Sequence, residues 1–92
     1  MSELQTRDER RKQTVNRVHR IQGQLAALER DIQSDHTCEQ LVTQASAIEK
    51  AMSSLILHMM EGYLEHQARP LIETDPDQAL QEIKRLFELI TR

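Results

Sequence analysis

The sequence predicts an all-α protein, and three observations lead to that prediction. The 92 residues include only two glycines, two prolines, one tyrosine and one phenylalanine. Runs of β-branched residues, which favour strands, are absent. Apolar residues recur three or four positions apart, which is the spacing of one helix face. The length allows one domain, residues 1–92.

The first predicted helix covers residues 5–33. Gly23 interrupts it at little cost and would permit close contact with a second helix. Its apolar residues have the heptad spacing of a seam between packed helices, and they are Val18, Ile21, Leu25, Leu28 and Ile32.

The second predicted helix covers residues 36–68. Asp35 and Thr37 are alternative N-caps, and Thr37 with Gln40 would form a capping box. Pro70 is expected to end the helix, because proline disfavours helical backbone at the residue before it. One apolar stripe consists of Leu41, Ala45, Ile48, Met52, Leu55 and Met59, and a second of Val42, Leu57, Met60 and Leu64.

The third predicted helix starts at Asp75-Pro76, an N-cap followed by proline in the first helical position. It runs to about Ile90, and its apolar face consists of Leu80, Ile83, Phe87 and Ile90.

These helix lengths bear on assembly. A helix of about 30 residues is about 45 Å long, so such helices cannot close a compact core within one short chain. We expect a three-helix protomer in which the two long helices form an antiparallel hairpin. Two hairpins would pair into a four-helix-bundle homodimer, and a dimer of dimers would give a homotetramer.

Charge is unevenly distributed along the chain. The net charge is −3, yet basic residues gather between positions 7 and 20. A basic segment on an acidic protein indicates an anionic partner, most simply double-stranded DNA, although a solvated helix face is the alternative. The candidate DNA-binding residues are Arg10, Arg11, Lys12, Arg17, His19 and Arg20, with Lys50 from the second helix.

Cys38 is the only cysteine, and either N-cap places it in the first turn of the second helix. Free backbone N–H groups there favour an anion, so the position suits a thiolate and makes Cys38 a candidate switch. The alternative is a small apolar residue in a helix seam. A lone cysteine, no signal peptide and no transmembrane-length run predict a cytoplasmic protein without a membrane partner. No catalytic constellation or phosphate loop is present, so an enzyme is not expected.

Residues 17–28 resemble the R-x-x-R-I-x-G-Q-x-x-A-L signature of the CsoR/RcnR/FrmR repressors. The resemblance continues through Cys38 and residues 41–48 and covers about residues 10–67. It implies an all-α homotetrameric transcriptional repressor without a helix-turn-helix. Such a protein binds operator DNA through basic residues of its first two helices and leaves the DNA when an effector binds.

The effector positions depart from that family. In its metal sensors the cysteine pairs with His or Cys ligands of another protomer, 25 and 29 residues further on, which here gives Tyr63 and Gln67. Neither suits a soft or borderline metal. Ser2 stands where the formaldehyde sensor has proline, and the N-terminal histidine of nickel/cobalt sensors is absent. We therefore expect Cys38 to sense a thiol-reactive molecule, such as an aldehyde, another electrophile or a reactive sulfur species.

Two alternatives stay open. One is a repressor that senses Cu, Ni/Co or Zn through a non-standard ligand set drawn from Cys38, His36, His58 and His66. The other is a helical interaction module without DNA binding, whose basic face binds an acidic protein. No cofactor is expected beyond a possible metal ion.

Overall fold

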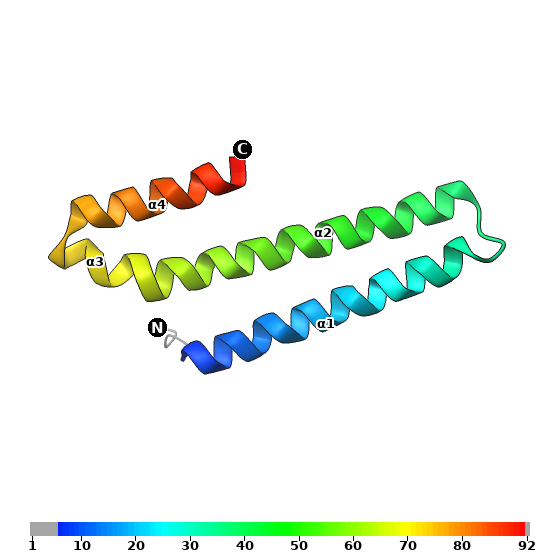
Figure 1. The fold of residues 1–92 in the computed structure, drawn as a ribbon, viewed down its shortest axis with the longest axis horizontal. Helices are drawn as coiled ribbons and strands as arrows, with labels where there is room; N and C mark the ends of the chain where they lie inside the picture. The colour runs from blue at the N-terminus through cyan, green and yellow to red at the C-terminus, as the bar shows by residue number, and fades with distance from the viewer. Residues whose placement is uncertain (1–5, 92) are drawn as a thin grey trace.

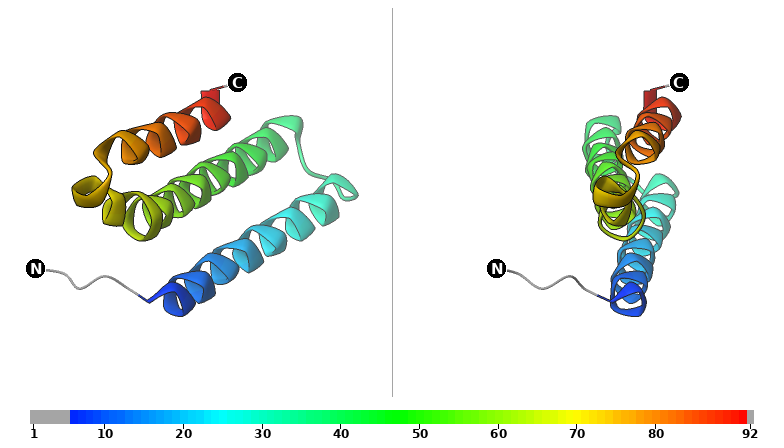
Figure 2. Two further views of the ribbon diagram at one scale, coloured as in Figure 1. Left: turned by 60° about the vertical axis from the view of Figure 1, so that its left-hand side comes forward. Right: turned by 90° about the vertical axis from the view of Figure 1, so that its left-hand side faces the viewer.

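The computed structural model describes residues 6–91, and in that part of the chain it has helices joined by a short loop at 33–37 and a break at Asp75, with no strand. The predicted all-α class is confirmed. The two long helices form an antiparallel hairpin, and the C-terminal helix turns back along the end of the second one (Figure 1; Figure 2). The elements are α1 (Arg7–Ile32), α2 (Cys38–Tyr63), η1 (Leu64–Ala68), α3 (Arg69–Thr74) and α4 (Pro76–Thr91).

The helix starts follow from side-chain caps. The Thr37 hydroxyl accepts a hydrogen bond from Gln40 N at 3.1 Å, and the Gln40 side chain accepts one from Thr37 N at 3.0 Å. This is the predicted capping box, and it makes Thr37 rather than Asp35 the N-cap. Asp75 caps α4 as predicted, through a 3.2 Å bond from Gln78 N.

Pro70 does not end the second helix, so that prediction was wrong. Arg69 keeps helical backbone angles (φ −56°, ψ −45°), and its N–H donates to the Leu64 carbonyl five residues back. This π-helical turn, η1, widens the helix before the proline, and Pro70 then stands at the start of α3, where no backbone N–H is required of it. The helix bends only at Asp75, which leaves the helical region (φ −154°, ψ 77°).

The core within one protomer is small. Ile21, Ile48 and Leu55 are buried between α1 and α2, with Leu28 and Ala51 packed against them. Ala68 of η1 and Ala79 of α4 are also buried, and their small side chains allow these two elements to approach closely. These residues account for the buried apolar side chains in the described part of the chain.

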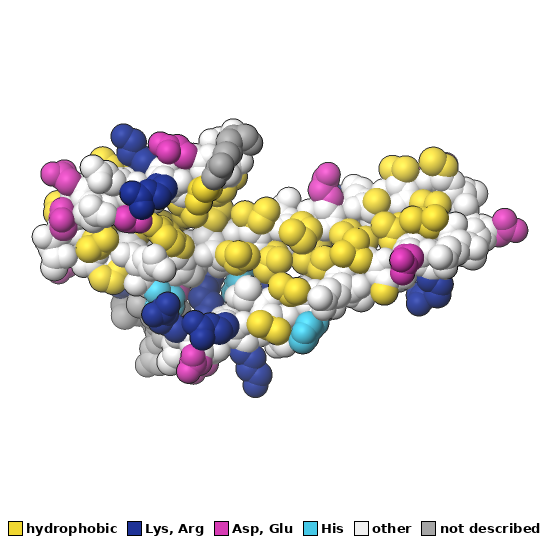
Figure 3. Space-filling view, in the orientation of Figure 1, with side chains coloured by type: hydrophobic (Ala, Val, Ile, Leu, Met, Phe, Trp, Pro, Cys, Tyr) yellow, Lys and Arg dark blue, Asp and Glu magenta, His cyan; other side chains and the backbone are white. Residues whose placement is uncertain are grey.

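Much of the predicted apolar seam is exposed in the protomer. Val18, Leu25 and Met52 are between 36% and 49% exposed. The reason is that α1 contacts α2 through a neighbouring row of residues that includes Ile21 and Leu28. The radius of gyration is 17.7 Å, against about 13 Å for a compact chain of this size. Hydrophobic side chains form a band along the hairpin and beneath α4 (Figure 3). Pairing into a four-helix bundle stays a prediction, and this band is the surface that it would cover.

Among the described residues, no helix is both long enough and apolar enough to cross a membrane.

A comparison of two substitutions on α2 tests this division between inner and outer faces. Leu55→Asp should unfold the protomer, with a loss of about 3 kcal/mol or more, because it places an unpaired charge in the buried seam. Met52→Asp should leave the helical circular dichroism intact but reduce the mass measured by light scattering, because Met52 is exposed until another copy covers it. Ser46→Asp, also exposed on α2, is the control. A wild-type monomer at micromolar concentration would contradict the predicted assembly.

Candidate functional site

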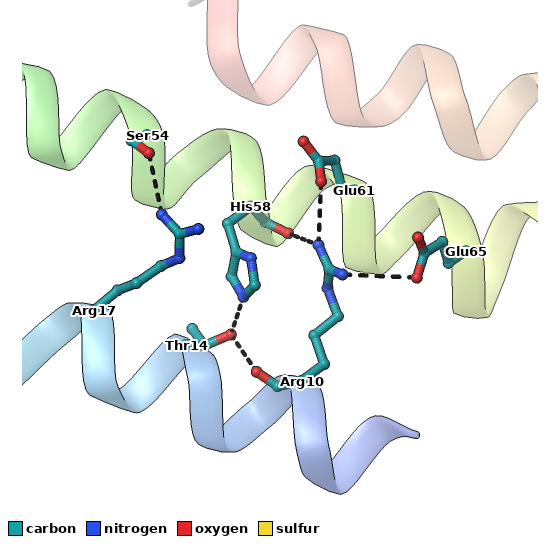
Figure 4. Close-up of polar contacts among 7 residues, drawn as sticks. All are labelled: Arg10, Thr14, Arg17, Ser54, His58, Glu61 and Glu65. Atoms are coloured by element: carbon teal, nitrogen blue, oxygen red, sulfur yellow. Dashed lines mark hydrogen bonds and ion pairs between the residues drawn. The ribbon is translucent and has the colours of Figure 1, made fainter. Parts of the chain in front are cut away.

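Arg10 joins the start of α1 to the end of α2. Its Nη2 donates a 2.6 Å hydrogen bond to the His58 carbonyl oxygen, and its guanidinium lies 3.6 Å from carboxylate oxygens of both Glu61 and Glu65. The side chain is only 12% exposed. Figure 4 shows it reaching across the hairpin. Arg10 was predicted as a DNA contact, and the structure gives its guanidinium partners on α2 and η1.

His58 forms a second link beside it. The residue is 7% exposed, and its Nε2 lies 2.9 Å from the Thr14 hydroxyl (Figure 4). That hydroxyl donates its proton to the Arg10 carbonyl at 2.8 Å, so the imidazole must be the donor to Thr14. Burial lowers the pKa of His58, and the charges of Arg10 and Arg17 lower it further. Its Nε2 is therefore engaged in holding the two helices together.

Together with a 3.1 Å bond from Arg17 Nη1 to Ser54, these contacts form a polar part of the hairpin interface. Sequence reasoning missed this. Arg10, Thr14, Arg17 and the buried Ile21 have the heptad spacing of residues that face a second helix. The spacing was not recognised because three of these four residues are polar. We call this the polar cluster, and its residues are Arg10, Thr14, Arg17, Ser54, His58, Glu61 and Glu65.

A groove of about 320 Å³ adjoins the polar cluster, and we call it the basic groove. It brings the basic start of α1 together with both predicted effector positions, Tyr63 and Gln67. The buried His66 Nε2 has no hydrogen-bond partner there. The lining residues are Arg7, Arg10, Arg11, Thr14 and Val15 from α1, and Met59, Gly62, Tyr63, His66 and Gln67 from α2 and η1.

Tyr63 is tied to α4. Its hydroxyl donates a 2.5 Å hydrogen bond to Glu82 Oε2. This bond, helped by burial, raises the pKa of Tyr63, and the same bond lowers the pKa of Glu82. Tyr63 is therefore a neutral phenol whose proton is engaged within the protomer.

Cys38 lies at the opposite end of the hairpin. It is exposed at the first residue of α2, and about 38 Å of helix separates it from Tyr63. His36 belongs to the same end, where its Nδ1 lies 2.9 Å from the Ser34 hydroxyl. Of the other proposed ligands, His58 and His66 lie at the far end. Ser2, a predicted effector position, is outside the described residues. Cys38 can therefore meet positions 63 and 67 only in another protomer.

The residues do not fit a metal ion within one protomer. In the described part of the chain, no group of three or more His, Cys, Asp or Glu side chains is placed to hold one.

The remaining basic residues do not share one face. Arg11, Lys12, His19, Arg20 and Lys50 are exposed. Successive helix residues turn by about 100°, so Arg11 and Lys12 point in different directions. One shallow hollow on α1 does combine two arginines with two amide side chains, and it is lined by Gln13, Asn16, Arg17 and Arg20.

Comparison with known proteins identifies the family. The family model described as a metal-sensitive transcriptional repressor matches residues 10–92. The chain belongs to this family. It is 31% identical over 81 residues to the copper-sensing transcriptional repressor CsoR of Bacillus subtilis (strain 168), covering 87% of this chain and 80% of CsoR. The members are repressors, so the chain is not an enzyme, as the sequence predicted.

A second relative is 34% identical over 80 residues, which is 86% of each chain. It is an uncharacterized protein in the bioA 5′ region of Serratia marcescens. No solved structure matches. The resemblance inferred from the sequence is thus confirmed at the level of the family.

The lowered pKa of His58 predicts a pH dependence of stability. As pH falls below about 6.5, the unfolded chain binds a proton at this residue before the folded chain does. The free energy of unfolding should therefore decline on going down from pH 7.5, and this contribution should level off below the lowered pKa. His58→Gln keeps an N–H near Thr14 without titrating, so it should flatten the profile. His19→Gln, at an exposed site, should keep the decline. Equal profiles for His58→Gln and wild type in denaturant unfolding would contradict this assignment.

Proposed function

We propose that this protein is an operator-binding repressor that is released from DNA by an effector bound between protomers. Family membership carries the proposal, and the exposed basic side chains of α1 support it. With few such side chains on each chain, binding would sum charges over two or more protomers. Most of them would contact phosphates, which position a protein on DNA and supply affinity.

The hollow on α1 is our first candidate for a DNA contact in the protomer. Arg17 and Arg20 would supply charge, and Gln13 and Asn16 would supply hydrogen bonds to the same stretch of backbone. Arg11, Lys12, His19 and Lys50 would extend the contact from other faces, provided that protomers combine to bring those faces to DNA.

Arg17→Ala with Arg20→Ala should weaken operator binding while leaving the helical circular dichroism unchanged. Each lost phosphate contact should reduce the slope of log K against log salt by about 0.9, because fewer counterions are released. Arg30→Ala removes an exposed arginine from the other end of α1 and is the matched control. Wild-type affinity of the double variant at every salt concentration would reduce the hollow to a solvated surface and favour the interaction-module alternative.

A metal ion is the first candidate effector, because the family is metal-sensitive and CsoR of B. subtilis senses copper. A site would need donors from two protomers. At the two helix ends that would meet, the chain offers the exposed thiol of Cys38 and the ring nitrogen of His66, which is unpartnered but buried within the protomer and would have to be uncovered. The Tyr63 phenol is engaged by Glu82, and the His58 ring is engaged by Thr14, so neither is a free donor.

A thiol-reactive molecule is the second candidate effector. The departure at positions 63 and 67 favours it, since Tyr and Gln replace the ligands of the metal sensors. Cys38 is also exposed in the first turn of α2, where a reagent can reach it.

Replacement of the thiol separates these effectors from mechanisms that do not use it. Cys38→Ser should bind operator as the wild type does but should no longer release it. The probes are Cu(I), Ni(II), Co(II), Zn(II) and formaldehyde, each followed by DNA release and by mass spectrometry of the intact protein. A stoichiometric metal adduct that releases DNA identifies a metal sensor, and a covalent adduct at Cys38 identifies a thiol sensor. Cys38→Ser with Ser46→Cys, which moves the thiol along α2, is the control. Normal release by Cys38→Ser would remove this residue from the mechanism.

A further inference from the structure

We propose that Arg10 is a positioning residue and not a DNA contact. It acts as a strut that fixes the start of α1 against the end of α2, so that the basic side chains of α1 are held in place by the helix segment that carries positions 63 and 67. Its part in operator binding rests on the function proposed above, but the strut itself does not.

The first observation is that both terminal nitrogens of the guanidinium face partners across the hairpin, while its Nε is buried without a hydrogen-bond partner. Its three partners are the His58 carbonyl and the carboxylates of Glu61 and Glu65, all on the α2 side of the hairpin. Two acids offset its charge, and the side chain is 12% exposed. A guanidinium that is buried to this extent and lies beside two carboxylates is poorly placed to reach a phosphate. Arg11 and Arg20, by contrast, are exposed.

The second observation is the glycine beneath it. A Cβ at Gly62 would lie 2.5 Å from Arg10 Nε and 3.0 Å from Arg10 Cδ. The backbone does not require glycine there, because no described glycine has a positive φ. A glycine inside this helix is therefore explained by the Arg10 side chain, which occupies the space that a Cβ at position 62 would need. Gly23, in the interior of α1, has no atom within 4 Å of the equivalent Cβ position.

The third observation is that the residues contacted by Arg10 lie beside the two predicted effector positions. Glu61 and Gly62 directly precede Tyr63, and Glu65 lies between Tyr63 and Gln67. The Arg10 carbonyl also accepts the Thr14 hydroxyl that His58 binds, so side chain and backbone of one residue are both tied to α2. A displacement of the helix around positions 63–67 must move the start of α1 or break these contacts.

Salt dependence distinguishes a strut from a phosphate contact. Arg10→Gln should weaken operator binding about fivefold or more, which is the lower end of the range for coupling between two sites. The slope of log K against log salt should not change, because no phosphate contact is lost. Arg20→Ala should lower both affinity and slope. A drop in slope for Arg10→Gln equal to that of Arg20→Ala would overturn the proposal.

A matched pair of glycine variants tests the strut without DNA. Alanine usually strengthens a helix relative to glycine, so Gly23→Ala should preserve or increase amide protection in α1. Gly62→Ala should instead speed hydrogen exchange at residues 10–20, because it displaces the Arg10 side chain. Combining Gly62→Ala with Arg10→Gln should add little, since both remove the same contact.

Equal exchange in the Gly62→Ala and Gly23→Ala proteins would overturn the strut. If the wild type binds no operator, the proposed function fails, while the exchange comparison still decides whether Arg10 positions α1.

Discussion

Arg10 crosses from α1 to α2 where few apolar side chains are available to join the two helices. In the middle of the hairpin, Ile21, Ile48 and Leu55 provide an ordinary buried seam. At the open end, the contacts are hydrogen bonds and ion pairs made by Arg10 and His58. Polar contacts fix the relative position of two helices more strictly than apolar contacts do. Removing one partner costs more stability, because the other polar group is left buried without a hydrogen bond. The alignment of α1 along α2, and with it the placement of the α1 arginines, depends on these few bonds.

The shape of the protomer fits a subunit better than an independent domain. Its principal extents are 59 × 29 × 19 Å, and only a handful of apolar residues are buried. The two ends of the hairpin also carry different chemistry, with the thiol of Cys38 at one end and the basic groove at the other. An antiparallel arrangement of two such hairpins would bring unlike ends together. The function of each end is then a property of the assembly.

The helices could be predicted from sequence because their signals are local. Apolar spacing predicted the three long helices. Side-chain caps predicted the start at Pro76 and offered Asp35 and Thr37 as alternative caps for the second helix, of which the structure shows Thr37. The predicted helix end at Pro70 was wrong because a π-helical turn accommodates the proline within a continuing helix. No local rule anticipates such a turn. The seam was displaced because polar residues hold it. Val18 and Leu25 satisfy the heptad pattern as well as Ile21 does, yet they face outward.

The candidate site was predictable in composition but not in arrangement. The sequence singled out Cys38, Tyr63, Gln67 and the basic segment. It did not indicate that Arg10 faces α2, because a sequence shows a charge but not the partner of that charge. Nor did it indicate that Tyr63 is bonded to Glu82, since that contact depends on how α4 folds back. Gly62 carried a usable signal, because glycine inside a helix often marks a close approach.

The π-helical turn at Leu64–Ala68 has a consequence for the spacing of the two effector positions. Residues four apart on a regular α-helix stack on one face, and ligand pairs with that spacing rely on it. Here the wide turn begins directly after Tyr63 and contains Gln67, so the angle between these two side chains about the helix axis differs from that regular stacking, although both line the basic groove. A ligand that requires regular stacking would have to tighten the turn by one residue. That change would rotate everything beyond it by about 100°, including α4. The irregular turn therefore makes the direction of the C-terminal helix sensitive to what binds at these two positions.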